Sequence, residues 1–185
     1  MFKLTNEECR ISHMSTRTEN HGDEHVGAVD LKLVCTMNND ALNMFDPELL
    51  PFLFKAKPAE EHDLVDAVDD EERLTDIRFH ALPKTLGWDY KGAGYRLVIE
   101  SGITGDRDII LINVGLKKFK ITPSQGGSVE IEFTASANPN GDEVALLYEL
   151  QQEYVDVTLE PPSAERQAQM MIDDARDDDE DDEAA

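Results

Sequence analysis

Residues 94–137 constrain the fold more than any other stretch, because their pattern predicts four short strands in succession. Apolar and polar side chains alternate strictly over Val129–Thr134, so this strand should bury one face and expose the other. A turn sequence, Ser124–Gly127, comes directly before it, and its two glycines can take the positive φ that a tight reversal needs. We therefore expect an antiparallel meander in which the last two strands form a hairpin.

Two further features of this stretch bear on how its strands are aligned. Leu116 and Phe119 share one face only if the strand contains a bulge, which we place near Lys117 and Lys118. The preceding run, Ile109–Val114, is apolar at nearly every position, so we expect it in the interior of the sheet.

The flanking segments extend the β pattern on both sides. Residues 26–37 alternate as a long strand and residues 154–159 as a closing strand. The polar residues 15–24 are expected to form a loop, and helical turns are expected over 40–54 and 143–151.

These elements predict a mainly β fold, an antiparallel β-sandwich with short helical insertions, and a closed β-barrel is the alternative. We favour the sandwich because helical insertions can cap a stack of two sheets. The expected core consists of apolar residues from the strands: Val29, Leu31, Leu33, Leu97, Ile99, Ile110, Ile112, Ile131, Phe133, Val155 and Val157.

Charge divides the chain into a body and a tail. The formal net charge is −23. Residues 163–185 hold ten acids and two arginines, which leaves −15 on residues 1–162. We expect residues 1–162 to form a single β-rich domain with an acidic loop near residues 56–72. The tail is expected to be largely disordered, because like charges repel and few apolar residues are present to dock.

The two cysteines, Cys9 and Cys35, are too few for a disulfide framework in a chain of 185 residues. We expect them to be buried, reduced thiols of a cytoplasmic protein. No signal peptide is visible, and no apolar run approaches the ~18–20 residues that a membrane span needs. The expected partners therefore do not include a membrane.

A search for catalytic and metal-binding motifs finds little. No phosphate-binding loop, dinucleotide fingerprint, nucleophile elbow or CxxC pair occurs, so we expect neither an enzyme nor a cofactor. His21 and His25 flank Asp23 and Glu24 and are the nearest approach to a metal site. The glycine at position 22 argues against the helix that would bring the two imidazoles together, so a polar turn is the favoured interpretation.

Four segments carry a resemblance to a group of known proteins. They are TRTENHG at 16–22, LNMFDPELLPFLF at 42–54, GYRLVIESG at 94–102 and FKITPSQGGSVEIEF at 119–133. Together they resemble small proteins of tailed bacteriophages and prophages that have no assigned activity. The resemblance implies a phage origin and a bacterial host cytoplasm, and it carries over no functional residues.

Three kinds of function are consistent with these features. The first is an acidic interaction module that binds a basic surface on a bacterial or phage protein, as an inhibitor or a nucleic-acid mimic. The alternative is a single-stranded DNA-binding protein of phage recombination or replication, in which an acidic tail competes with DNA. The body charge of −15 counts against this alternative. A virion component is a further possibility.

Each binding hypothesis has its own candidate residues. The interaction module would use the acid run of the tail: Asp177, Asp178, Asp179, Glu180, Asp181 and Asp182. The nucleic-acid alternative would use the lysine cluster around one aromatic ring: Lys117, Lys118, Phe119 and Lys120.

Overall fold

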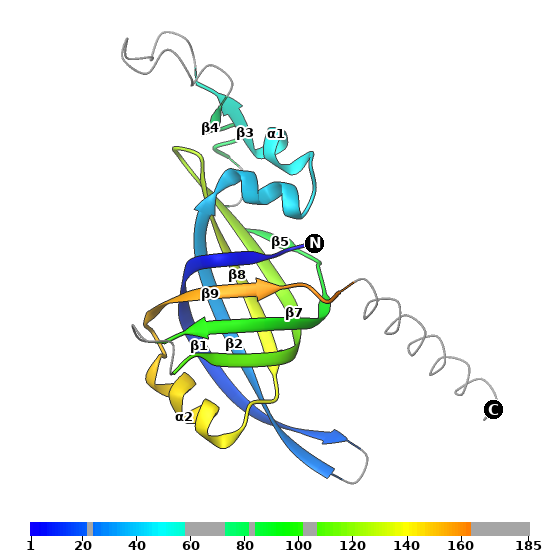
Figure 1. Ribbon diagram of the computed structural model, residues 1–185. Coiled ribbons are helices and arrows are strands. Elements are labelled where there is room, and N and C mark those ends of the chain that lie inside the picture. Colours follow the sequence, from blue (N-terminus) through cyan, green and yellow to red (C-terminus); the bar gives the residue numbers. More distant parts are fainter. Residues whose placement is uncertain (22–23, 58–72, 82–83, 102–106, 164–185) are drawn as a thin grey trace, which may run out of the picture.

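The computed structural model describes residues 1–21, 24–57, 73–81, 84–101 and 107–163. Its main feature is a closed antiparallel barrel of six strands with one extra strand beside it (Figure 1). The barrel strands are β1 (Leu4–His21), β2 (Glu24–Asn38), β6 (Gly92–Glu100), β7 (Ile109–Ser124), β8 (Ser128–Ala137) and β9 (Tyr154–Glu160). The extra strand is β5 (Leu86–Trp88), which pairs with β7.

The order of the strands around the barrel is β7-β6-β9-β1-β2-β8, and pairing between β8 and β7 closes the ring. The expected mainly β, antiparallel fold is confirmed. The closed barrel that was the alternative is present, and the favoured sandwich is wrong. The two helical insertions lie at opposite ends of the barrel (Figure 1), so they cap a ring of strands and not a stack of two sheets.

A bulge in β7 allows this closure. The pairing of β7 with β8 shifts register between Lys117 and Lys120, and Lys118 has a φ of 58°. Leu116 and Phe119 are both buried as a result. The bulge predicted near Lys117 and Lys118 is therefore confirmed, and it bends and twists the strand as such irregularities do.

The first half of β7 faces the opposite way from the one expected. Ile109 and Leu111 are buried, whereas Ile110 is 46% exposed and Ile112 is 67% exposed. The placing of Ile110 and Ile112 in the core is wrong, because a barrel strand has one buried face and an apolar run does not reveal which. The other expected core residues are buried: Val29, Leu31, Leu33, Leu97, Ile99, Ile131, Phe133, Val155 and Val157.

Cys9 and Cys35 form a disulfide bond. They are directly paired in the register of β1 with β2, where their Cα atoms lie 4.3 Å apart, and both are buried. The expectation of reduced thiols is therefore wrong, although the expectation of burial holds. Disulfides persist mainly in oxidising compartments, so this bond gives no support to the expected cytoplasmic location.

The β1–β2 hairpin continues beyond the barrel as a two-stranded arm (Figure 1). Pairing of β1 with β9 ends at Arg10, and pairing of β2 with β8 ends at Val29. The polar segment 15–24, expected as a loop, is strand over most of its length. Its threonines favour extended backbone, and a polar sequence suits a ribbon with both faces in water.

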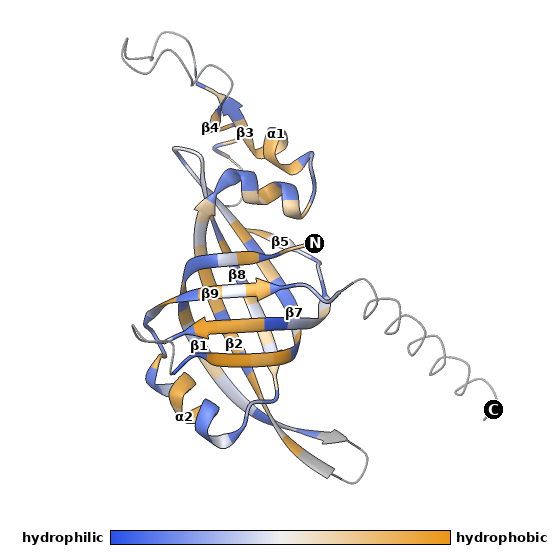
Figure 2. Ribbon diagram, in the orientation of Figure 1, coloured by the Kyte–Doolittle hydropathy of each residue, from blue (hydrophilic) through white to orange (hydrophobic). Residues whose placement is uncertain are grey.

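An insertion between β2 and β5 covers one end of the barrel. It consists of η1 (Asn39–Met44), α1 (Leu49–Leu53), β3 (Phe54–Ala56) and β4 (Leu74–Ile77). Figure 2 shows α1 as a mainly hydrophobic segment beside β3. Leu42, Leu49 and Leu53 are buried, so the insertion packs onto the barrel core. Most of the predicted acidic loop and the predicted tail lie outside the described residues.

The other end of the barrel is closed by α2 (Gly141–Glu149). Asn140 caps this helix: its side chain accepts a hydrogen bond from the Glu143 amide, and the Glu143 carboxylate accepts one from the Asn140 amide. Leu147 is fully buried. Across the described residues, every helix is too short or too polar to cross a membrane.

Reduction of the Cys9–Cys35 bond is expected to destabilise the fold. The bond joins residues 26 apart in sequence, and the loop-closure estimate for a loop of that length is about 3.5 kcal/mol. Urea unfolding with and without a reductant measures the difference. A Cys9→Ala/Cys35→Ala variant is the control and should not respond to reductant. An unchanged urea midpoint for the native chain would show that the bond contributes nothing.

Candidate functional site

The acidic charge of the chain is concentrated outside the described fold. The described residues contain 20 of the 40 acids and 15 of the 17 lysines and arginines, a net charge of −5. The segment 58–72 alone has eight acids and neither lysine nor arginine. Outside the insertion, the described residues hold 16 acids and 10 lysines and arginines, so the barrel is acidic but carries only −6 of the −15 on residues 1–162.

The described part of the insertion holds five cations and four acids. The cations lie on or beside β3, β4 and the start of β5: Lys55, Lys57, Arg73, Arg78 and Lys84. Of the acids, Asp76 lies on β4 and Asp40 lines a hollow together with Arg73. Among the described residues, none of the five forms an ion pair. All five side chains are exposed. Exposed cations without ion pairs are available to contact an anionic partner.

Two phenylalanines are exposed beside these cations. Phe52 of α1 is 52% exposed and Phe79, just after β4, is 42% exposed. Their ring centroids are 5.4 Å apart. Large aromatic rings are mostly buried in proteins, so an exposed pair is a candidate contact surface. We call Phe52, Phe79 and the five cations the insertion surface.

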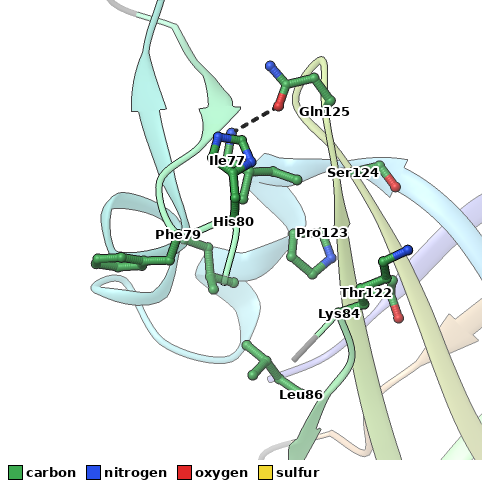
Figure 3. Close-up of a pocket in the computed structure, with 10 residues that line it drawn as sticks. Ile77, Phe79, His80, Lys84, Leu86, Thr122, Pro123, Ser124 and Gln125 are labelled. Carbon is green, nitrogen blue, oxygen red and sulfur yellow. Dashed lines mark hydrogen bonds between the residues drawn. The ribbon is translucent and has the colours of Figure 1, made fainter. Parts of the chain in front are cut away.

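A cavity of about 370 Å³ opens next to Phe79, between β4 and the end of β7 (Figure 3). Its walls are mainly apolar, with Leu53, Ile77, Leu86 and Pro123 contributing. In Figure 3 the residues after β4 and the residues of β7 face each other across it, with Leu86 at its foot. The polar lining comes from His80, Lys84, Thr122, Ser124 and Gln125.

The β7–β8 turn holds the two sides of this cavity together. Gln125 Oε1 accepts a hydrogen bond from the Ile77 amide at 3.3 Å, and Gln125 Nε2 donates to Asp76 Oδ1 at 2.7 Å. The Gly126 amide donates to the Thr75 carbonyl at 3.0 Å. Because backbone and side chain both contribute, the turn and β4 are fixed to each other and the cavity between them is preformed.

A buried asparagine joins the same turn to the insertion. Asn39 begins η1 and is 7% exposed. Its Nδ2 donates to the Leu74 carbonyl at 2.6 Å, and its backbone amide donates to the Gly127 carbonyl at 3.0 Å. Burying a polar side chain is costly unless it is hydrogen-bonded, so Asn39 specifies how η1, β4 and the turn meet.

The lysine cluster predicted as a nucleic-acid contact does not form one exposed site. Phe119 is 1% exposed and packs inside the barrel against Phe2, Phe45 and Phe133, so it cannot stack on a base. Its inward direction follows from the bulge at Lys118, which was itself predicted. The aromatic member of the cluster is therefore part of the core.

Two lysines of this cluster pair with carboxylates on the outer face of the barrel. Lys117 Nζ lies 3.4 Å from Asp30, and Lys120 Nζ lies 2.9 Å from Glu132. Burial raises the pKa of each carboxyl, but hydrogen bonds and neighbouring cations lower it more, so both pKa values lie below their ordinary values. Lys118 is exposed and has no ion pair among the described residues.

The histidines proposed as metal ligands occupy the arm. The register pairs His21 with Glu24 and His25 with Asn20, so the two histidines are not cross-strand partners. Within the described part of the chain, no group of three or more histidine, cysteine or acidic side chains is placed to hold a metal ion. The tail acids Asp177–Asp182 lie outside the described residues.

Aromatic side chains gather around Trp88. The hydroxyl groups of Tyr90 and Tyr95 are 2.7 Å apart, and the ring of Phe45 contacts both Trp88 and Tyr90. Burial and the hydrogen bond with Tyr90 raise the pKa of Tyr95. A phenol with a raised pKa stays protonated, so this pair contributes structure and is no candidate base.

Comparison with protein-family models, with curated proteins and with solved structures finds no match to this chain.

The insertion surface was missed at the level of sequence because its parts are far apart in the chain. Lys57 and Arg73 stand on either side of the acidic segment 58–72, whose charge masks theirs in any window of sequence. Phe52 belongs to an apolar run in which Leu49, Leu53 and Phe54 are buried, so its exposure is not evident from the sequence. One signal was present, because cations occur at both ends of the acidic segment and none occurs within it.

Substitution of Gly127 by alanine is expected to disturb the contact between the turn and β4. Gly127 has a φ of 80°, and an added Cβ would lie 3.1 Å from Thr75 Cγ2. Gly126 is the matched control, since it also has a positive φ but has open space around it. In urea unfolding, Gly126→Ala should cost about 1–2 kcal/mol for the backbone alone. Gly127→Ala should cost about 1–3 kcal/mol more. Equal costs would mean that the close approach to Thr75 is unimportant.

Proposed function

We propose that this protein binds single-stranded nucleic acid through the insertion surface. The observation that carries the proposal is the set of five exposed cations without ion pairs beside two exposed phenylalanine rings. Proteins that bind single strands combine these two elements, a positively charged path for the backbone and aromatic rings on which bases stack.

The negative charge of the body is unevenly distributed. Of the −15 on residues 1–162, the described residues carry −5 and the segment 58–72 carries −8, and five of the fifteen described cations lie on the insertion surface. Phosphate must therefore compete with the acids of 58–72 for these cations. Each phosphate contact on a single strand contributes a salt dependence with a slope of about −0.7. Three or four contacts from the insertion surface would therefore give a slope of about −2 to −3.

The exposed rings favour a single strand over a duplex. A base in a duplex has both faces covered by its neighbours, whereas an unpaired base offers a free face to Phe52 or Phe79. Stacking of this kind is worth about 1–3 kcal/mol per base and tolerates every sequence. The proposed protein is thus a binder with little sequence preference, which suits an accessory role in phage recombination or replication in a bacterial host.

Removing a ring or two cations should weaken binding in different ways. Phe79→Ala is expected to lower affinity for a labelled oligothymidine by roughly 5-fold or more at every salt concentration. Arg78→Ala/Lys84→Ala is expected to lower affinity at low salt and to reduce the salt slope by about 1.4. Fluorescence anisotropy over a range of salt concentrations measures both effects.

The matched control removes the same charge elsewhere. Lys91 and Arg107 are also exposed and free of ion pairs among the described residues, and neither belongs to the insertion surface. Lys91→Ala/Arg107→Ala should change the affinity much less than Arg78→Ala/Lys84→Ala. Equal losses would mean that overall charge, and not this surface, governs binding. Absence of binding at low salt would reject the function.

A second candidate function is the binding of a basic protein surface by the acidic segments. It is favoured by the concentration of half of all acids outside the described fold, ten of them in residues 164–185. Such runs can present carboxylates where a nucleic acid would present phosphates. The candidate residues remain Asp177–Asp182.

Truncation of residues 173–185 separates the two functions. If the tail competes with nucleic acid for the insertion surface, the truncated chain should bind oligothymidine more tightly than the full chain. If the tail binds a basic protein, affinity capture from phage-infected cells should lose a salt-sensitive partner on truncation, because exposed charge pairs are screened by salt. Unchanged behaviour in both measurements would assign the tail to neither role.

A further inference from the structure

We propose that the cavity between β4 and β7 receives one unpaired base of the bound strand. This inference rests on the proposed function and adds a defined subsite to it. The cavity, of about 370 Å³, adjoins Phe79 and is lined by Lys84, so it is part of the region where a strand would lie. Pockets of this size, mainly apolar with a few polar groups, are typical of sites for small aromatic ligands.

The walls of the cavity suit a flat apolar group. Leu53 closes it on the side of the insertion and is 3% exposed, while Ile77, Leu86 and Pro123 form its remaining apolar lining. Figure 3 shows Pro123 and Leu86 directed into the space and the ring of Phe79 pointing away from β7. A base inside the cavity would therefore be enclosed by aliphatic side chains, and its neighbour in the strand would be free to stack on Phe79.

Two of the five polar side chains that line the cavity have hydrogen-bond partners. Both polar atoms of the Gln125 amide are used, one with Ile77 and one with Asp76. The hydroxyl groups of Thr85 and Thr122 bond to each other at 3.0 Å. The side chains of His80, Lys84 and Ser124 remain to contact the hydrogen-bonding edge of a base. All three are exposed and none is fixed by a partner among the described residues, so we expect the cavity to distinguish bases only weakly.

Charge complementarity identifies the occupant as part of a nucleic acid. Lys84 and His80 both line the cavity, and no carboxylate among the described residues does. Arg78 directly follows Ile77, which lines the cavity, and Lys55 lies on β3, the strand paired with β4. An apolar group that arrives with a negative charge next to it fits this environment, and a base with its own phosphate has both properties.

The subsite is tested by a double-mutant cycle that combines one substitution in the protein with removal of one base from the oligonucleotide. The probe is a labelled oligothymidine of about eight nucleotides, a length within the site sizes known for small barrels. In a series of such probes, each position in turn lacks its base. Native protein should bind the probe that lacks the enclosed base roughly 5-fold or more weakly than the intact oligonucleotide. Probes that lack a base stacked on Phe52 or Phe79 should also bind more weakly, and the protein variant described next tells the enclosed base from these.

The protein variant fills the cavity from its rim. Ser124 is exposed and lines the opening, so Ser124→Trp should occupy the space that the base would take. The variant should bind the intact oligonucleotide as weakly as native protein binds the sensitive abasic probe, and it should no longer distinguish the two. If Ser124→Trp has a lower melting temperature than native protein, His80→Trp gives a second test from the other side of the cavity. Ser15→Trp, on the exposed arm, is the matched control and should behave as native protein does.

The outcomes separate the subsite from the function. Additive effects of Ser124→Trp and base removal would overturn the subsite, since groups that do not interact contribute independently. A uniform response to base removal along the probe would also overturn it, while salt-dependent binding that is sensitive to Phe79→Ala would leave the function standing. If neither native protein nor the control variant binds any probe at low salt, the function and the subsite both fail.

Discussion

The pairing of β7 with β8 is the interaction on which the rest of this structure depends. It turns a seven-stranded sheet into a closed ring, and closure satisfies the backbone groups that an open edge would leave to water. β7 can do this only because its halves have different partners: the first pairs with β6, and the second pairs with β8 and β5. Residues in left-handed backbone at Asn113 and Lys118 bend the strand enough to serve all three neighbours.

The same pairing positions the candidate site. The hairpin that joins β7 to β8 extends past the barrel rim, and its turn is bonded to β4 through Gln125 and Gly126. The β7–β8 pair thus forms part of the barrel wall along most of its length, and its turn end forms one side of the cavity. The insertion contributes the opposite side, which is why a cavity exists here and why it is lined from three separate parts of the chain.

The features of the fold that depend only on neighbouring residues in the sequence were predicted correctly. The alternation in β8, the glycine turn and the bulge near Lys118 were all predicted, because each depends on neighbours in sequence. The apolar run in β7 was placed with Ile112 inside because it lacks alternation. Ring closure and the Cys9–Cys35 bond depend on which distant strands become neighbours, and composition does not contain that information.

Electrostatics explains why the candidate site could not be predicted either. A charge sum over a sequence window adds the acids of segment 58–72 to Lys57 and Arg73, whereas the folded surface separates five exposed cations from most carboxylates of the barrel. Screening limits each charge to a range of about 10 Å at moderate ionic strength, so the arrangement of neighbours matters more than the total. Lys57 and Arg73 are nevertheless joined directly to acidic sequence. Salt must therefore weaken two opposing effects: the attraction of phosphate to these cations and the repulsion of phosphate by the adjacent acids. The measured salt slope reports the difference between them.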